Sequence, residues 1–269
     1  MDTLFLSHIF NLLLLLVLTS AIMFHKGMHS LREQCHERDR RVLLNFKHTI
    51  DDPSSILSSW SDDGRDCCEW VGIRCDNATE LRLDSCQLQN INPSLHDVIT
   101  SVNLSYNYLH GELPKRLLNL QKLKSLDLHG NKLSGPIPAW LGQLEHLQVF
   151  DVSENLISGP IPPVLGNLSS LITLNLNSNN VNGSLPESLG QLLNLEMLSF
   201  HDNHLMGHVS ERNFVRLSNL KVLGMGSPSL IFDFDLLWVP PFQLIELHLL
   251  HMVDSIFPEW IYTQKSLKC

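Results

Sequence analysis

Hydrophobic and polar residues alternate in short segments that recur with a fixed period along most of the chain. The same asparagine position recurs every 24 residues, at Asn107, Asn131, Asn155, Asn179 and Asn203. An apolar-x-apolar pair precedes each one, at Val102/Leu104, Leu126/Leu128, Phe150/Val152, Leu174/Leu176 and Leu198/Phe200. One such unit cannot bury its apolar side alone, so the period predicts a solenoid of stacked units.

Each unit predicts one short strand followed by a turn. Period-two alternation directs the apolar pair inward and the intervening residues outward. The asparagine amide can donate to and accept from backbone groups at the strand end, so stacked copies predict a ladder of hydrogen bonds. Glycine follows the asparagine at the fourth position and supplies a backbone conformation that residues with a Cβ resist.

Looser units flank this regular block. Their apolar pairs are Leu81/Leu83, Leu223/Met225 and Leu247/Leu249. Eight strands at about 4.8 Å spacing predict a concave sheet about 34 Å wide. Leu267 begins a ninth unit that Cys269 leaves unfinished. Because an open solenoid end exposes strand edges and apolar side chains, we expect a fragment or a truncated product.

The segment before the first strand predicts a helical cap. Apolar residues at positions 42, 43, 46 and 50 recur at helical spacing, and Pro53 follows the pattern. We expect Trp60 and Trp70 to pack inside the cap, with a ligand platform as the alternative.

Four of the six cysteines lie in this cap. The neighbours Cys67 and Cys68 are poor partners for each other, so we expect the bridges Cys35–Cys67 and Cys68–Cys75. A zinc site is the alternative use of such a group. Disulfides are favoured because an oxidising compartment is predicted for this chain.

The N-terminus and the charge bear on compartment and partners. Residues 4–24 are almost wholly apolar, which predicts a signal peptide over residues 1–24, with an uncleaved membrane anchor as the alternative. The protein is therefore expected to enter the secretory pathway and to be extracellular or at the plasma membrane. The net charge of −9 argues against a nucleic-acid partner. Sequons for N-glycosylation occur at Asn77, Asn103, Asn167 and Asn182.

Outward positions on the strands predict a polar strip on the concave face. They lie two and four residues before the turn asparagine, or directly before it. The candidate ligand contacts are Asp127, His129, Asp151, Ser153, Glu154, Asn175, Asn177, Ser199, His201 and Asp202. A rigid concave face is where solenoids bind ligands, although a solvated sheet face gives the same pattern. A glycan on Asn103 would cover the first strands.

The sequence contains no recognisable motif for catalysis or metal binding. There is no H-E-x-x-H, no G-x-S-x-G and no kinase motif. Asp127 and Asp151 could form a glycosidase pair, but an open sheet offers them no pocket. His129 and His201 are three strands apart, too far to share a zinc ion. We therefore expect no enzyme, cofactor or metal, whereas histidines on this face predict pH-sensitive binding.

Several segments resemble one protein family. C-H-E-R-D-R-R-V-L-L-N-F-K, D-P-S-S-I-L-S-S-W and D-C-C-E-W-V-G-I-R-C resemble the plant leucine-rich-repeat N-terminal domain. The pattern L-x-L-x-x-N-x-L-x-G-x-I-P resembles the plant extracellular repeat, in which G-x-I-P adds a second strand. W-V-P-P-F-Q-L-I-E-L-H-L-L and F-P-E-W-I-Y-T-Q-K-S-L-K resemble part of the plant receptor-like proteins that recognise microbial elicitors.

The resemblance implies an α/β leucine-rich-repeat solenoid. Its expected features are a right-handed superhelix, a parallel concave sheet and convex 3-10 or irregular turns. The disulfide-bonded cap would span residues 35–76 and the repeats residues 77–269.

The resemblance also implies the ligand-binding part of a receptor-like protein that acts in pathogen perception. The expected ligand is a microbial or endogenous peptide, protein or glycan, and membrane co-receptor kinases are expected partners of the full-length protein. One alternative is a secreted inhibitor similar to the polygalacturonase-inhibiting proteins. The other is a non-functional truncated receptor product.

Overall fold

A computed structural model describes residues 35, 37–48, 50–63, 66–75, 79–86, 88–89, 99–250 and 258–267. The predicted signal segment, Asn77, His251 and Cys269 lie outside the described residues. Within those ranges, no helix is both long and apolar enough to cross a membrane.

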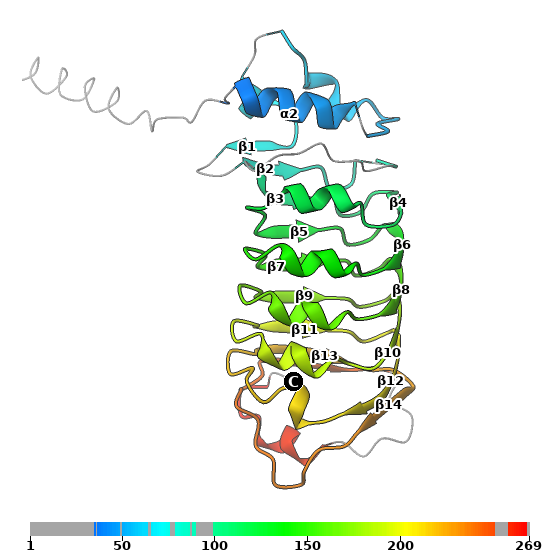
Figure 1. The fold of residues 1–269 in the computed structure, drawn as a ribbon, viewed down its shortest axis with the longest axis vertical. Helices are drawn as coiled ribbons and strands as arrows, with labels where there is room; N and C mark the ends of the chain where they lie inside the picture. The colour runs from blue at the N-terminus through cyan, green and yellow to red at the C-terminus, as the bar shows by residue number, and fades with distance from the viewer. Residues whose placement is uncertain are drawn as a thin grey trace, which may run out of the picture. The chain divides into compact units, whose positions relative to one another are not determined.

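The described strands include a nine-stranded sheet whose members follow one another along the stack (Figure 1). Its members are β1 (Ile73–Cys75), β2 (Thr79–Arg82), β3 (Ile99–Asn103), β5 (Ser125–Asp127), β7 (Val149–Asp151), β9 (Thr173–Asn175), β11 (Met197–Ser199), β13 (Val222–Met225) and β15 (Glu246–Leu249). From β2 onward all neighbours pair in parallel, which confirms the eight predicted strands. The sequence did not predict β1, which pairs antiparallel with β2 and extends the sheet into the cap.

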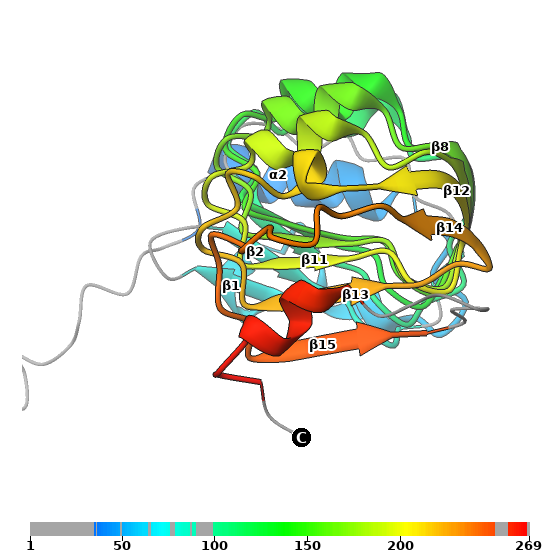
Figure 2. The ribbon, with the colours of Figure 1, turned by 90° about the horizontal axis from the view of Figure 1, so that it is seen from below.

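A second, parallel sheet follows the turn of each repeat. It consists of β4 (His110–Gly111), β6 (Lys132–Pro136), β8 (Leu156–Pro160), β10 (Asn180–Gly183), β12 (His204–Val209) and β14 (Ser229–Phe232). These strands confirm the extra strand that the G-x-I-P segment implies. Viewed along the stack, the two sheets and a row of 3-10 helices form the sides of each coil (Figure 2).

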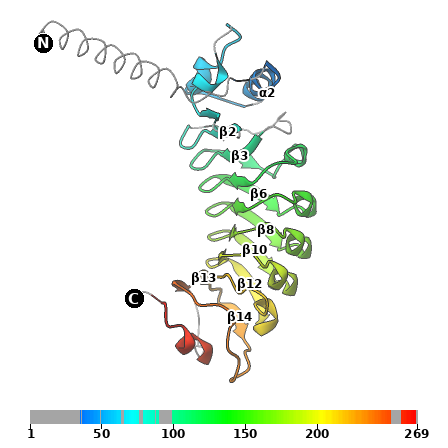
Figure 3. The same cartoon turned by 90° about the vertical axis from the view of Figure 1, so that its left-hand side faces the viewer.

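Short 3-10 helices cover the outer side, where they fan apart as the stack curves (Figure 3). They are η3 (Lys115–Asn119), η4 (Ala139–Gln143), η5 (Pro163–Asn167), η6 (Glu187–Gln191) and η7 (Glu211–Asn213). The last 3-10 helix, η8 (Glu259–Thr263), lies apart from this row, near the end of the described chain. The predicted convex 3-10 turns are confirmed. Because these turns are wider than a strand, they place the sheet on the concave side.

The turn asparagines are buried and connect adjacent repeats. Asn155 is typical: its Nδ2 donates to the carbonyls of Leu128 at 3.0 Å and Val152 at 3.1 Å, and its Oδ1 accepts from the Leu133 amide at 2.8 Å. Asn131, Asn179 and Asn203 repeat the same pattern. The predicted ladder is therefore present, and each rung satisfies backbone groups that two repeats would otherwise bury unpaired.

The cap closes the first end of the hydrophobic core. Helix α2 (Glu37–Lys47) buries Val42, Leu43 and Phe46, and it ends before Ile50, which is buried in the segment that follows. Two further 3-10 turns, η1 (Ile56–Ser59) and η2 (Cys67–Glu69), complete the cap. Trp60 and Trp70 stack with ring centroids 5.6 Å apart and are buried, as core packing requires.

Both predicted disulfides are present in the cap. Cys35 bonds Cys67 and Cys68 bonds Cys75, with Cα–Cα distances of 5.4 Å and 5.6 Å. Asp66 accepts from the backbone amides of Cys35 and Cys68 and so supports both bridges. The pairing uses the four thiols that a zinc site would need.

Replacing Asn155 with alanine tests the asparagine ladder. The substitution removes the partners of buried carbonyl and amide groups in two repeats, so we expect a loss of about 3 kcal/mol in the free energy of unfolding. Urea unfolding followed by circular dichroism measures it. The control is Asn180→Ala on an exposed strand position of β10, which should change stability by under about 0.5 kcal/mol. Equal losses in both variants would contradict the ladder's role.

Candidate functional site

The residue directly before each turn position adopts a left-handed backbone conformation. We call this row the left-handed rim; its members are Ser85, Tyr106, Gly130, Glu154, Ser178 and Asp202, with φ between 51° and 66°. A left-handed conformation costs a residue with a Cβ roughly 1 to 2 kcal/mol. The rim turns the chain out of each strand, and its side chains line one edge of the concave face.

Side chains on the concave face bond from strand to strand. Asp127 accepts from Asn103 Nδ2 at 3.0 Å and from the His129 amide at 3.1 Å. Asp151 accepts from Asn175 Nδ2 at 2.9 Å and from the Ser153 amide at 2.9 Å. Both carboxylates are half-buried. These bonds fix the orientation of polar groups before any ligand arrives.

A chain of four side chains crosses three neighbouring repeats. The Ser153 hydroxyl lies 2.5 Å from Asp151 Oδ1, and Ser153 Oγ lies 2.7 Å from His129 Nδ1. On the other side of the ring, His129 Nε2 lies 2.8 Å from the Tyr106 hydroxyl. The rings of Tyr106 and His129 meet edge to face with centroids 4.6 Å apart. The chain therefore links a half-buried carboxylate to an exposed phenol.

The later strands continue the polar surface, but one of their outward positions has no side chain. The Ser199 hydroxyl donates to Asn177 Oδ1 at 2.5 Å, and Ser178 Oγ donates to Asp202 Oδ2 at 3.0 Å. Next to them, Gly224 leaves the outward position of β13 without a side chain. His201 and His248 come from the repeats before and after this glycine, and their ring centroids are 6.2 Å apart.

The structure thus joins most of the predicted candidates, in two separate bonded groups. It connects Asp127, His129, Asp151, Ser153, Glu154 and Asn175, and separately Asn177 with Ser199. Ser153 and Ser199 were expected to face outward, but they are only 2% and 1% exposed because neighbouring side chains cover them. Their hydroxyls support the surface from below.

Tyr106 is a residue of this face that the sequence analysis did not select. It occupies the position before Asn107, where Glu154 and Asp202 were selected in their own repeats. That register was the available signal. An aromatic residue at this register does not stand out as a polar contact in the sequence, but Tyr106 is 58% exposed.

The concave face carries a negative field. No lysine or arginine occupies the outward positions two and four before the turn asparagine in the five regular repeats. Burial raises the pKa of Asp127, as do the nearby charges of Asp151 and Asp84, against the lowering effect of the hydrogen bond from the His129 backbone. The surface therefore suits a ligand that brings positive charge or hydrogen-bond donors.

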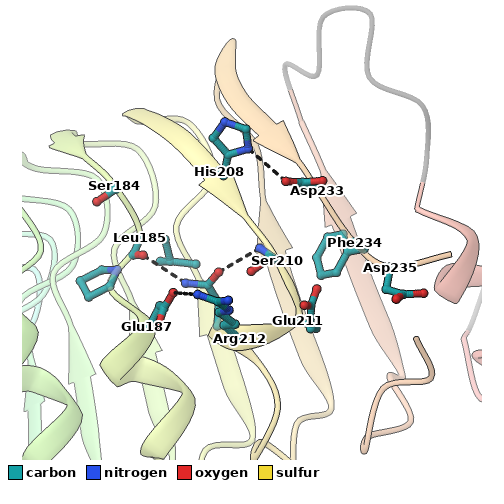
Figure 4. A pocket seen from close by; sticks show the side chains of 12 residues that line it. Ser184, Leu185, Glu187, His208, Ser210, Glu211, Arg212, Asp233, Phe234 and Asp235 are labelled. Atoms are coloured by element: carbon teal, nitrogen blue, oxygen red, sulfur yellow. Dashed lines mark hydrogen bonds and ion pairs between the residues drawn. The ribbon is translucent and has the colours of Figure 1, made fainter. Parts of the chain in front are cut away.

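A hollow of about 650 Å³ lies on the flank of the stack, between the ends of the second sheet and the 3-10 helices (Figure 4). Two pairs of its side chains are in contact: Arg212 with Glu187 at 3.6 Å, and His208 with Asp233 at 3.4 Å. Buried Asn213 donates to the Leu185 carbonyl. These contacts hold adjacent repeats together, so we place the candidate ligand site on the concave face.

The sequons fall on different faces. Asn167 ends η5 and Asn182 lies in β10, and both are exposed. Asn103 is half-buried on the concave face, where its Nδ2 donates to Asp127 and its Oδ1 accepts from Ser105. A glycan at Asn103 would have to break these hydrogen bonds.

The raised pKa of Asp127 predicts a pH dependence. The folded protein holds this proton more tightly than the unfolded chain, so the contribution to stability is present below the unfolded value of 3.8 and is lost as pH rises through the higher folded pKa. Asp127→Asn should therefore gain stability relative to the wild type as pH rises from below 3.8 to neutrality. Urea unfolding at a series of pH values measures this change, and a constant difference would contradict it.

Glycan mapping tests the placement of the sequons. In protein secreted from plant cells, we expect glycans on Asn167 and Asn182 and an unmodified Asn103. Mass spectrometry of peptides after enzymatic deglycosylation in heavy-oxygen water locates the occupied sites. A glycopeptide with a glycan on Asn103 would show that the hydrogen bonds of Asn103 on the concave face do not prevent glycosylation.

Comparisons with known proteins agree with this geometry. A family described as "Leucine rich repeat N-terminal domain" matches residues 36–76, and one described as "Leucine-rich repeat region" matches residues 77–269. Receptor-like protein EIX2 of Solanum lycopersicum is 35% identical over 97 residues, which are 35% of this chain and 8% of that protein. A polygalacturonase inhibitor of Vitis vinifera is 34% identical over 103 residues, 35% of this chain and 30% of the inhibitor.

The solved structures include the receptor kinase HAESA of Arabidopsis in complex with the peptide hormone IDA and the co-receptor SERK1. Its TM-score is 0.67 at 27% identity, and the alignment covers 87% of this chain and 45% of that chain. The present chain thus spans only part of the relatives it matches. It belongs to the leucine-rich-repeat family, and its cap and repeats resemble those of plant receptor-like proteins.

Proposed function

We propose that this chain forms the N-terminal ligand-binding part of the ectodomain of a plant receptor-like protein that acts in pathogen perception. The ligand is a peptide, protein or glycan that lies on the concave face and meets the side chains of β5 to β11. The protein follows the secretory route to the apoplast or the plasma membrane, consistent with its two disulfides.

The observation that carries this proposal is the lattice of bonded side chains on the concave face. On four successive strands, Asn103 donates to Asp127 and Asn175 donates to Asp151, so these side chains are held as two bonded pairs. A surface fixed in advance loses little conformational entropy when a ligand binds. The same bonds employ Asp127 and Asp151 as acceptors on an open face, which favours recognition over hydrolysis.

The receptor hypothesis also predicts a protein partner. HAESA was solved with both a peptide hormone and the co-receptor SERK1. We propose that the full-length relative of this chain likewise engages a membrane co-receptor kinase once ligand is bound.

Inhibition of a microbial polygalacturonase is the second candidate. The specific observation in its favour is the inhibitor of Vitis vinifera, of which this chain covers 30%, a larger share than the 8% it covers of EIX2. An acidic concave face would suit a basic enzyme surface.

A decoy experiment tests the proposal. Leaf discs are treated with extracts of microbial cultures, and the oxidative burst is recorded with and without an excess of the purified chain. If the chain binds an elicitor, it should deplete the free elicitor and reduce the burst. Asn177→Arg on the concave face should abolish the effect, because a long cation replaces the hydrogen-bond partner of Ser199.

The matched control is Asn194→Arg, an exposed position between η6 and β11. This variant should reduce the burst as the wild type does. A decoy effect that both variants retain would place the ligand elsewhere, and no effect with any extract would contradict a role in elicitor binding. Loss of polygalacturonase activity in the extract would support the inhibitor instead.

A further inference from the structure

Three side chains meet at one place on the left-handed rim. His129 Nε2 lies 2.8 Å from the Tyr106 hydroxyl and 4.0 Å from Glu154 Oε2. Tyr106 and Glu154 are rim residues of the repeats on either side of His129. We call Tyr106, His129 and Glu154 the rim clamp.

The hydrogen-bond chain beneath the clamp sets the proton on His129. The Ser153 hydroxyl has a single proton, and its 2.5 Å contact with the carboxylate of Asp151 uses it. Ser153 Oγ must then accept from His129 Nδ1–H. With Nδ1 protonated, the neutral ring presents Nε2 as an acceptor, and the Tyr106 hydroxyl donates to it.

The outward polar groups of the clamp are therefore acceptors. The Tyr106 hydroxyl uses its one hydrogen in the bond to His129 Nε2, so the lone pairs of its oxygen remain as acceptors. The Glu154 side chain is 60% exposed, and the neutral His129 ring, whose Nε2 lies 4.0 Å from Glu154 Oε2, leaves the carboxylate charge available. Asp127 and Asp151 add negative charge from the adjacent positions of the lattice.

Gly130 provides the space that the tyrosine ring needs. This glycine is the rim residue between Tyr106 and Glu154, and a Cβ built on it would lie 2.8 Å from Tyr106 Cδ1. The ring therefore lies over the backbone of the neighbouring repeat. Tyr106 itself holds φ at 52°, a rare conformation for a bulky side chain. Strain of this kind is found at ligand clamps, where the surrounding structure maintains it.

We propose that the rim clamp binds the cationic side chain of an arginine or lysine in the ligand. Glu154 supplies a charged acceptor, the Tyr106 oxygen a neutral one, and the exposed ring a negative π face. Arginine fits best, because its planar guanidinium donates in several directions and stacks on aromatic rings. This inference rests on the proposed ligand-binding role of the concave face, and it adds the chemical class of one ligand group.

Titration with a defined probe tests the clamp. The probe is fluorescently labelled, acetylated tetra-arginine amide, and its anisotropy is recorded against the full chain at neutral pH. Glu154→Gln and Tyr106→Ala should each weaken binding at least about threefold, since each removes one favourable contact with the cation. Gly130→Ala should weaken it as well, because the added Cβ displaces the tyrosine ring.

Glu145→Gln provides the matched control. It removes the same charge from an exposed position outside the concave face, so it corrects for the general attraction of an acidic protein for a basic peptide. It should bind the probe as the wild type does. Circular dichroism and thermal unfolding of every variant check that the fold is intact.

The ring nitrogens of His129 give an independent readout. Nitrogen chemical shifts at neutral pH should report a proton on Nδ1 and a bare Nε2, and Ser153→Ala should produce a mixture of tautomers. A proton on Nε2 in the wild type would contradict the proposed clamp. The proposal is also contradicted if Glu154→Gln and Tyr106→Ala bind the probe as tightly as Glu145→Gln does. Neither result bears on the decoy experiment. If the decoy experiment fails while probe binding still depends on the clamp residues, only the proposed function is contradicted.

Discussion

The buried hydrogen bonds of the turn asparagines are the constraint on which the rest of the structure depends. Each repeat must end its strand, turn inside the core and start again on the other sheet without leaving peptide groups unpaired. Asn131, for example, donates to carbonyls of its own repeat and of the preceding one, and it accepts from the Leu109 amide. Because leaving a buried donor or acceptor unpaired costs about 1 to 3 kcal/mol, the rungs fix both the period and the stacking register.

This constraint also creates the candidate site. A chain that turns into a buried asparagine reaches it through a left-handed residue, and the structure uses that conformation at Tyr106, Glu154 and Asp202, where glycine would be easier. The left-handed rim therefore places large or charged side chains at fixed intervals along one edge of the sheet. The clamp is a consequence of the turn geometry, with Gly130 as the one member of the regular repeats that takes the easier residue.

Much of this architecture could be predicted from the sequence, because period and alternation determine it. The spacing of Asn107 to Asn203 predicts the strands, and the four grouped cysteines predict both bridges. The contacts between side chains could not be predicted from the sequence. Ser153 and Ser199 have outward register, yet larger neighbours cover them, and alternation alone does not report the size of neighbours. Tyr106 reaches His129 only because of its positive φ, which the sequence does not specify for an aromatic residue. Strand β1 was missed because its three residues, Ile73–Cys75, lie in the cap and outside the repeat period.

The bonded lattice limits how such a surface can change its specificity. Asp151 holds Ser153, Ser153 holds His129, and His129 holds Tyr106, so a substitution at the half-buried end alters the donors and acceptors presented at the exposed end. Exposed rim residues such as Glu154, whose carboxylate meets only His129 Nε2 among the described residues, are less constrained by the coupling. A change of ligand charge is therefore easiest at the rim, whereas a change within the lattice must be compensated on the neighbouring strand. This separation allows a rigid sheet to keep its geometry while one edge of it adapts to different ligands.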